Sequence, residues 1–200
     1  MRVVAPIAIA SVFAAGIVYY GLHRAPAAAR IASPRPPTPV EPASEADRAV
    51  APSHRMVPPI QGLRTSDLVD TFNSSRGNGT RKHEATDILA SRGTPVQAMV
   101  DGVIQKLFLS APGGNTIYEF DDAGEYCYYY AHLDRYAEGL AQGQRVRAGD
   151  LIGYVGSTGN ADPNTPHLHL AIFELGPEKR WWEGTPINPY PILLRLAQPG

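Results

Sequence analysis

Cysteine is nearly absent from this 200-residue sequence, which contains only Cys127. A single cysteine cannot form a disulfide within the chain. Cys127 stands between two tyrosines in a β-favouring segment. We therefore expect it to be a buried strand residue rather than a reactive or metal-binding thiol.

The sequence also lacks a cluster of basic residues. Residues 1–55 contain six arginines and three acidic residues, which leaves twelve basic and sixteen acidic residues in the rest of the chain. Nucleic-acid-binding domains usually carry a basic surface. This mildly acidic balance therefore argues against nucleic acid as a partner.

A sustained apolar repeat of 3.6 residues is missing as well. We therefore expect little helix, in short pieces such as one near Leu133–Leu140. The glycines Gly153, Gly156 and Gly159 do not indicate a phosphate-binding loop, because no Lys-Ser/Thr pair follows them and no helix is indicated. Their expected role is to shape turns.

Strand patterns are what the sequence does contain. Residues 95–100 and 103–108 flank Asp101-Gly102, a dipeptide typical of tight hairpin turns. A second hairpin is predicted between residues 116–120 and 125–131. The sequence therefore predicts an all-β domain of antiparallel strands. In the last of these segments the alternation places four side chains on one face, namely Tyr126, Tyr128, Tyr130 and His132.

The N-terminus carries an uncharged apolar run from Val3 to Leu22. A run of about 20 apolar residues can span a bilayer as a helix, whereas the apolar part of a signal peptide is commonly about 7 to 15 residues long. We expect residues 1–23 to be a membrane anchor that holds the domain on the periplasmic, extracytoplasmic side of the cell envelope. The alternative is a cleaved signal, for which residues 25–29 offer small side chains, and secretion of the protein.

Residues 24–59 are rich in alanine and proline and predict an extended, disordered linker, because they lack the apolar content that would offset the entropy of ordering. His23 and His54 are interpreted as solvated residues of the anchor edge and the linker. The remaining chain is expected to form one domain over residues 60–195, with a tail at residues 196–200.

Two histidines stand two residues apart in the segment Pro166-His167-Leu168-His169. In a strand, His167 and His169 share one face. Upstream, His83 and Asp87 are two strand periods apart and would again share a face. Two imidazoles and a carboxylate suit Zn²⁺, which keeps an open position for water at catalytic sites. The simpler alternative for His167 and His169 is a pair of half-exposed strand residues.

Four motifs follow one another along the chain, namely His83-x-x-x-Asp87, Tyr130-Ala131-His132-Leu133, Gly149-Asp150-Leu151-Ile152-Gly153-Tyr154-Val155-Gly156-Ser157-Thr158-Gly159 and Pro166-His167-Leu168-His169. Their order resembles peptidase family M23, the zinc metallopeptidases of the LytM or lysostaphin type. The similarity runs from about Leu63 to Pro191. One departure is Ala85, which stands where the family usually has glycine, so the local backbone there is in question.

The resemblance implies a LytM-type antiparallel sheet or half-barrel and a role for each site residue. It makes His83, Asp87 and His169 the zinc ligands and leaves His132 and His167 unligated beside the metal. One histidine would take a proton from an activated water and the other would donate to the oxyanion. Which of the two does which is left open. Glu84 is not cast as the base, because it would point to the opposite strand face.

The substrate that the resemblance implies is bacterial peptidoglycan, cleaved in its peptide bridges or stems. Trp181 and Trp182 are candidates for a wall of the substrate groove or for packing on the sheet, and Asn73 and Arg76 are weaker groove candidates. One alternative is a non-catalytic regulator that binds the wall or activates other hydrolases. Another is a structural zinc module. A protein regulator that holds the enzyme latent is also considered.

Overall fold

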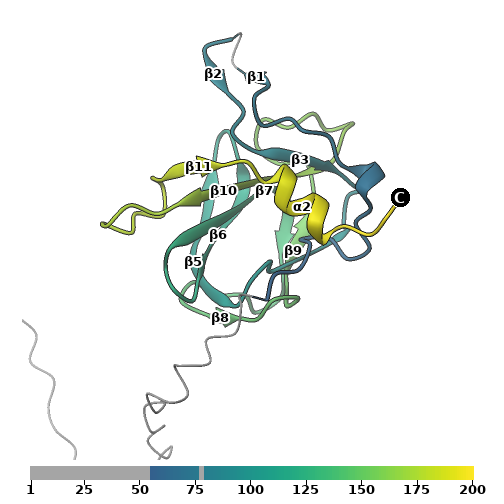
Figure 1. Ribbon diagram of the computed structural model, residues 1–200. Helices are drawn as coiled ribbons and strands as arrows, with labels where there is room; N and C mark the ends of the chain where they lie inside the picture. Colours follow the sequence, from purple (N-terminus) through teal and green to yellow (C-terminus); the bar gives the residue numbers. More distant parts are fainter. Residues whose placement is uncertain (1–54, 77–78) are drawn as a thin grey trace, which may run out of the picture. The chain divides into compact units, whose positions relative to one another are not determined.

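The computed structural model describes residues 55–76 and 79–200, and Figure 1 shows how their strands are arranged. The predicted apolar helix, the linker up to residue 54, His23 and His54 lie outside the described residues. The strands are β1 (Ser75–Arg76), β2 (Arg81–Lys82), β3 (Thr86–Leu89), β4 (Pro95–Gln97), β5 (Gly102–Ser110), β6 (Gly114–Asp121), β7 (Tyr126–Tyr136), β8 (Arg145–Val146), β9 (Leu151–Val155), β10 (His167–Glu174) and β11 (Thr185–Ile187), and the helices are the 3-10 turn η1 (Thr65–Asp67) and α2 (Tyr190–Leu196).

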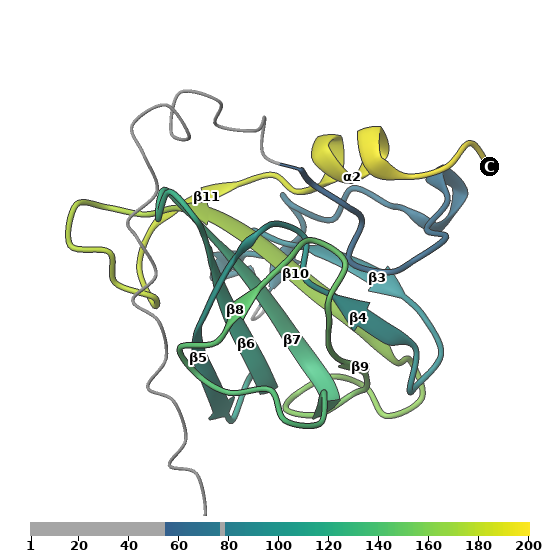
Figure 2. The same ribbon diagram turned by 90° about the horizontal axis from the view of Figure 1, so that it is seen from below.

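Nine of these strands form one sheet whose main path runs β11-β10-β7-β6-β5-β8. β3 pairs with β10, and β9 pairs with both β4 and β7, while β1 and β2 form a separate two-stranded hairpin. Every pairing between these named strands is antiparallel. The prediction of a mainly β, antiparallel domain with little helix is confirmed for the described residues. Figure 2 shows the long strands β5, β6, β7 and β10 running side by side.

Strand β10 has the alternation that its sequence predicts. Its even-numbered apolar residues Leu168, Leu170 and Ile172 are buried, and the intervening positions are less buried. Burying such a side chain contributes about 1.5–3 kcal/mol. β7 lies along one edge of β10, and β3 and β11 share the other edge. The apolar face therefore fixes which side of β10 remains free for His167 and His169.

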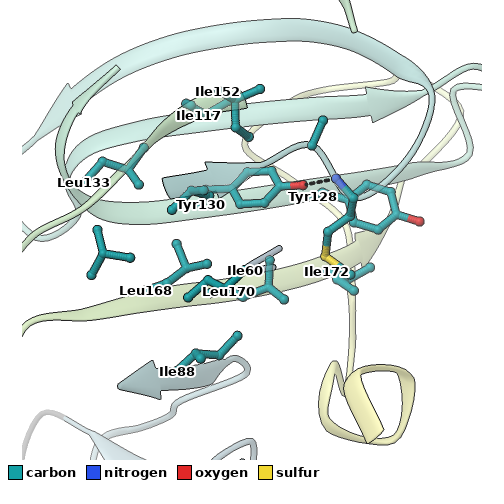
Figure 3. Close-up of a cluster of buried hydrophobic side chains, with 14 of the residues drawn as sticks. Ile60, Ile88, Ile117, Tyr128, Tyr130, Leu133, Ile152, Leu168, Leu170 and Ile172 are labelled. Carbon is teal, nitrogen blue, oxygen red and sulfur yellow. Dashed lines mark hydrogen bonds between the residues drawn. The ribbon is translucent and has the colours of Figure 1, made fainter. Parts of the chain in front are cut away.

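The Tyr130 hydroxyl is a buried polar group among the apolar side chains of the core (Figure 3). The Tyr130 hydroxyl accepts the backbone N–H of Met99 at 3.0 Å and donates to Glu119 Oε2 at 2.5 Å. Glu119 is fully buried, and its Oε1 has no hydrogen-bond partner among residues 55–76 and 79–200. Burial raises the pKa of the Glu119 carboxyl to about 8.

The hairpin predicted around Asp101-Gly102 is wrong, because β4 pairs with β9 while β5 pairs with β6 and β8. The two residues serve another purpose. Asp101 Oδ1 accepts the backbone N–H of Ala148 at 2.7 Å. A Cβ on Gly102 would lie 2.0 Å from the Phe120 carbonyl oxygen, so glycine permits the close approach of β5 to β6. The second predicted hairpin is confirmed as β6 and β7.

The helix predicted near Leu133–Leu140 is also wrong, since β7 continues to Tyr136 and its end pairs with β9. The one α-helix of the described residues is α2, which buries Leu193 in the core. A proline stands at the start of α2, where its missing N–H costs nothing. In residues 55–76 and 79–200, no helix is long and apolar enough to cross a membrane.

Both predicted domain edges lie inside the folded unit. The N–H of Val57 donates to Met99 O and the N–H of Gln97 donates to Pro59 O, each at 2.9 Å, so residues 57–59 belong to the domain and not to the linker. At the other end, the N–H of Gln198 donates to Leu63 O at 2.9 Å. The expected tail therefore pairs with the start of the domain.

Glu119→Gln should change how stability depends on pH. With a folded pKa near 8 and an ordinary value of 4.5, the folded protein keeps a proton that the unfolded chain releases between these pH values. The free energy of unfolding should therefore fall as pH rises from about 4.5 to 8, by up to about 1.4 kcal/mol per pH unit. Glu119→Gln should flatten that fall, measured by urea denaturation at several pH values.

The matched control is Glu125→Gln, in the turn between β6 and β7, which should keep the slope of the unchanged protein. Equal slopes for the protein and its Glu119→Gln variant would show that this carboxyl does not hold its proton in the folded state.

Candidate metal centre

Asp87 and His169 are direct partners across the β3–β10 pairing. In an antiparallel pair, opposed residues point their side chains to the same face. Leu168 and Leu170 bury the other face, so this register forces the carboxylate and the imidazole together. A slip of β10 by one residue would turn His169 toward the core and Leu168 and Leu170 away from it.

His83 reaches the same place by a turn rather than by strand alternation. It precedes β3, and Glu84 takes the left-handed conformation with φ 57°. The prediction that His83 and Asp87 share one strand is therefore wrong, because β3 begins after His83. Their side chains nevertheless lie close together. Ala85, at the position of the family's glycine, is fully buried and is not among the residues with positive φ. The backbone here does not require glycine.

Three ring and carboxylate atoms form a small triangle. His83 Nε2 lies 3.0 Å from His169 Nδ1 and 3.1 Å from Asp87 Oδ1, and His169 Nδ1 lies 3.0 Å from Asp87 Oδ1. In a tetrahedral zinc site with bonds of about 2.0–2.1 Å, neighbouring ligand atoms are about 3.3 Å apart. The triangle is close to one face of such a tetrahedron, so the donor set and its size fit a divalent ion.

Hydrogen bonds on the side away from the triangle orient the candidate ligand side chains. His83 Nδ1 lies 3.1 Å from the Thr71 carbonyl oxygen, which places its proton on Nδ1 and turns Nε2 toward the triangle. Arg76 Nη2 donates to Asp87 Oδ2 at 2.7 Å, leaving Oδ1 to face the histidines. Burial raises the pKa of Asp87, but the close contacts of its carboxylate with the rings of His169 and His83 outweigh burial and hold that pKa well below its ordinary value.

The prediction that His132 ends a row of tyrosines on one strand face is wrong. Tyr128 and Tyr130 face the core. Between the pairs Ile117–Tyr130 and Asn115–Leu133 the register shifts, and His132 has φ 59°. This bulge turns His132 away from the core and toward the metal-binding triangle, where its ring centroid is 5.5 Å from that of His169.

The two further histidines are oriented in the same way. His132 Nδ1 lies 2.8 Å from the Thr158 carbonyl oxygen, and His167 Nδ1 lies 2.9 Å from that of Thr165. In each ring the Nδ1 proton is therefore committed to a carbonyl, and Nε2 remains available. His167 Nε2 is 3.9 Å from Asp87 Oδ1, and burial lowers the pKa of His132 to about 4.

A pocket of about 320 Å³ opens over these groups. All five residues predicted from the sequence line it, so the structure brings the whole set together. Its other lining residues are Arg76, Arg81, Asn160, Ala161, Asp162 and Thr165. Of the two groove candidates before His83, Arg76 lines the pocket and Asn73 does not. Arg81 was missed, because no spacing rule connects the short β1–β2 hairpin to the histidines.

Trp181 and Trp182 were each a candidate either for packing on the sheet or for a wall of the substrate groove, and the structure places them differently. The Trp181 ring packs against Phe108 and Tyr118, with centroid distances of 5.4 and 4.7 Å. Trp182 is 61% exposed and lines a hollow that also borders His83, His169 and Tyr129. Trp182 is therefore the one placed to contact a ligand beside the metal-binding triangle.

The pattern of peptidase family M23 matches residues 81–189, more than half of the chain and all five site residues. The chain belongs to peptidase family M23. The resemblance stated from the four motifs is thereby confirmed.

Two curated relatives and one solved structure illustrate the similarity. The L-Ala–D-Glu endopeptidase of Bacillus subtilis (strain 168) is 37% identical over 129 residues, which are 62% of this chain and 38% of that protein. The peptidoglycan DD-endopeptidase ShyC of Vibrio cholerae is 35% identical over 118 residues, 59% of this chain and 24% of that protein. The structure of the antimicrobial peptidase lysostaphin from Staphylococcus simulans is 26% identical with a TM-score of 0.56, covering 71% of this chain and 55% of that chain. The chain thus matches well under half the length of these curated relatives.

Gly156→Ala should disturb the site by displacing backbone. Gly156 bridges to His167, and a Cβ there would lie 2.4 Å from Asp134 N and 2.8 Å from His132 O. We expect a loss of about 1–3 kcal/mol in the free energy of unfolding. The imidazole NMR signals of His132 and His167 should shift as well.

Gly176→Ala is the matched control, because nothing lies within 4 Å of the Cβ that it would add. It should leave stability and both imidazole signals unchanged. If the two alanine variants behaved alike, the packing between Gly156 and the His132 bulge would not be what orients these histidines.

Proposed function

We propose that this protein is a zinc-dependent endopeptidase that hydrolyses peptide bonds in the cross-links or stem peptides of bacterial peptidoglycan. The observation that carries the proposal is the convergence of five side chains on one pocket. Three of them present ligand atoms within 3.1 Å of one another, and two more present free ring nitrogens beside them.

His83, Asp87 and His169 would hold the ion through two nitrogens and one oxygen, a donor set typical of catalytic zinc. When bound there, zinc would supply Lewis-acid activation of a water molecule and of the scissile carbonyl. Asp87 contributes the single negative charge among the three ligands. Because Arg76 holds its second oxygen, Asp87 would bind through Oδ1 alone, which leaves a coordination position open.

His132 and His167 would handle the protons. Because burial lowers the pKa of His132 to about 4, its ring is neutral near pH 7, and Nε2 carries a lone pair that can accept a proton. This favours His132 as the base. His167, whose Nδ1 proton is also committed to a carbonyl, would donate from Nε2 when protonated and so stabilise the developing oxyanion.

The substrate class is supported by the relatives and by the open site. One relative is named for an L-Ala–D-Glu bond and another for peptidoglycan DD-endopeptidase activity. The pocket over the metal-binding triangle and the hollow beside Trp182 share His83 and His169, so an extended peptide could pass across the ligands. For location we propose the cell envelope, with Val3–Leu22 as a membrane anchor or a cleaved signal, on the evidence of sequence alone.

Single alanine variants of the full chain should separate metal binding from catalysis. His169→Ala and Asp87→Ala should lose zinc and activity together, because two ligands hold the ion poorly. His132→Ala and His167→Ala should retain zinc and lose about 100-fold or more in turnover. The double variant should fall short of the product of the two single losses, since the two groups act in one step.

The measurements are zinc per chain by atomic absorption and the release of new peptide ends from purified peptidoglycan, identified by mass spectrometry. His54→Ala, in the predicted linker, is the control and should change neither. Loss of zinc in His132→Ala as complete as in His169→Ala would refute the ligand assignment and favour a closed structural site. Zinc binding without any hydrolysis would favour the regulator alternative.

A further inference from the structure

The β1–β2 hairpin places two like charges directly opposite each other. Arg76 and Arg81 are cross-strand partners, and Ser75 pairs with Lys82. Opposed like charges destabilise an antiparallel pair, and this ladder has only two pairs with which to offset that cost. A local rule broken in this way is expected at functional sites.

The two arginines differ in their partners. Arg76 is neutralised by Asp87, with 2.7 Å between Nη2 and Oδ2. Within residues 55–76 and 79–200, the Arg81 side chain has no ion pair and no hydrogen bond, although it also lines the pocket over the metal-binding triangle. An arginine is always charged. Arg81 is therefore a cation at the site whose charge no described group compensates.

The remaining charged side chain of the pocket lining is Asp162. It belongs to the loop between β9 and β10, and its Oδ1 accepts the backbone N–H of Asn164 at 2.8 Å. Asp162 therefore has a local structural role in its own turn. The side of the pocket formed by β2 consequently presents a guanidinium with free donors, which suits an anionic group on a ligand.

We propose that Arg81 binds a carboxylate of the substrate close to the scissile bond. The inference rests on the proposed function and narrows its substrate class to peptides that carry a free carboxylate there, such as a stem peptide with an acidic residue. A bridge made only of glycine has no side-chain carboxylate to offer. A guanidinium fits this task because it can donate two parallel N–H bonds to both carboxylate oxygens.

The test uses the full chain with zinc and two versions of one stem peptide, which differ only in whether the free carboxylate of its Glu residue is amidated. The protein should cleave the carboxylate form with the higher kcat/KM. Arg81→Gln should lower kcat/KM for that form by about 10-fold to 100-fold, the worth of a hydrogen bond to a charged group, and should barely affect the amidated form. For the carboxylate form, Arg81→Lys should have a kcat/KM between those of the unchanged protein and of Arg81→Gln.

Lys82→Gln is the matched control, because it removes one charge from the same strand at an exposed position that does not line the pocket. It should leave the preference between the two peptides intact. Equal losses on both peptides in Arg81→Gln, or an unchanged preference, would overturn the assignment of Arg81 while leaving the endopeptidase function standing.

A binding measurement keeps the two proposals separable. Isothermal titration calorimetry with the two shortened, uncleavable product peptides should give a dissociation constant about 10-fold to 100-fold lower for the carboxylate form, and Arg81→Gln should abolish that difference. If neither stem peptide were hydrolysed, the endopeptidase function would fail, and these titrations would still decide whether Arg81 recognises a carboxylate. Equal dissociation constants would refute it.

Discussion

The site depends on the register between β3 and β10. Because His169 opposes Asp87 across this pair, the alternation that buries Leu168 and Ile88 also points the carboxylate and the imidazole outward to the same side. The apolar core therefore sets the position of two of the three candidate metal ligands, Asp87 and His169, while His83 is placed by the turn at Glu84. The free energy that resists a slip of β10 by one residue, which comes from burying its leucines and isoleucine, also resists separation of the ligand atoms.

Sequence patterns could predict the parts of this arrangement that follow from alternation. His167 and His169 lie on one face of β10 because strands have a period of two, and the β6–β7 hairpin follows from its turn residues. That all five site residues would lie together was predicted from the order of the family's motifs and not from the periodicity of the strands. Nothing in the local sequence of His83 indicated that a left-handed Glu84 would turn the chain there.

The failures of the sequence analysis share a physical cause, which is that long-range packing decided the local conformation. Asp101-Gly102 has the composition of a hairpin turn, but β4 finds β9 and Gly102 serves the close approach of β5 to Phe120. His132 leaves the alternation of β7 through a bulge that is visible only once β6 is paired. Arg81 carries no local signal, because only the folded chain brings it into the lining of the pocket with the histidines.

The charges around Asp87 explain why the β1–β2 hairpin matters to the metal centre. A carboxylate can use both oxygens on one ion, which would occupy a second coordination position. Here Arg76 takes Oδ2 while Oδ1 faces His83 and His169, so the carboxylate is divided between a permanent cation and the ligand triangle. For a metal ion held by the triangle, this division would favour binding through one oxygen of Asp87. Arg76 makes that contact and pairs with Arg81 across the hairpin, so both arginines line the same pocket.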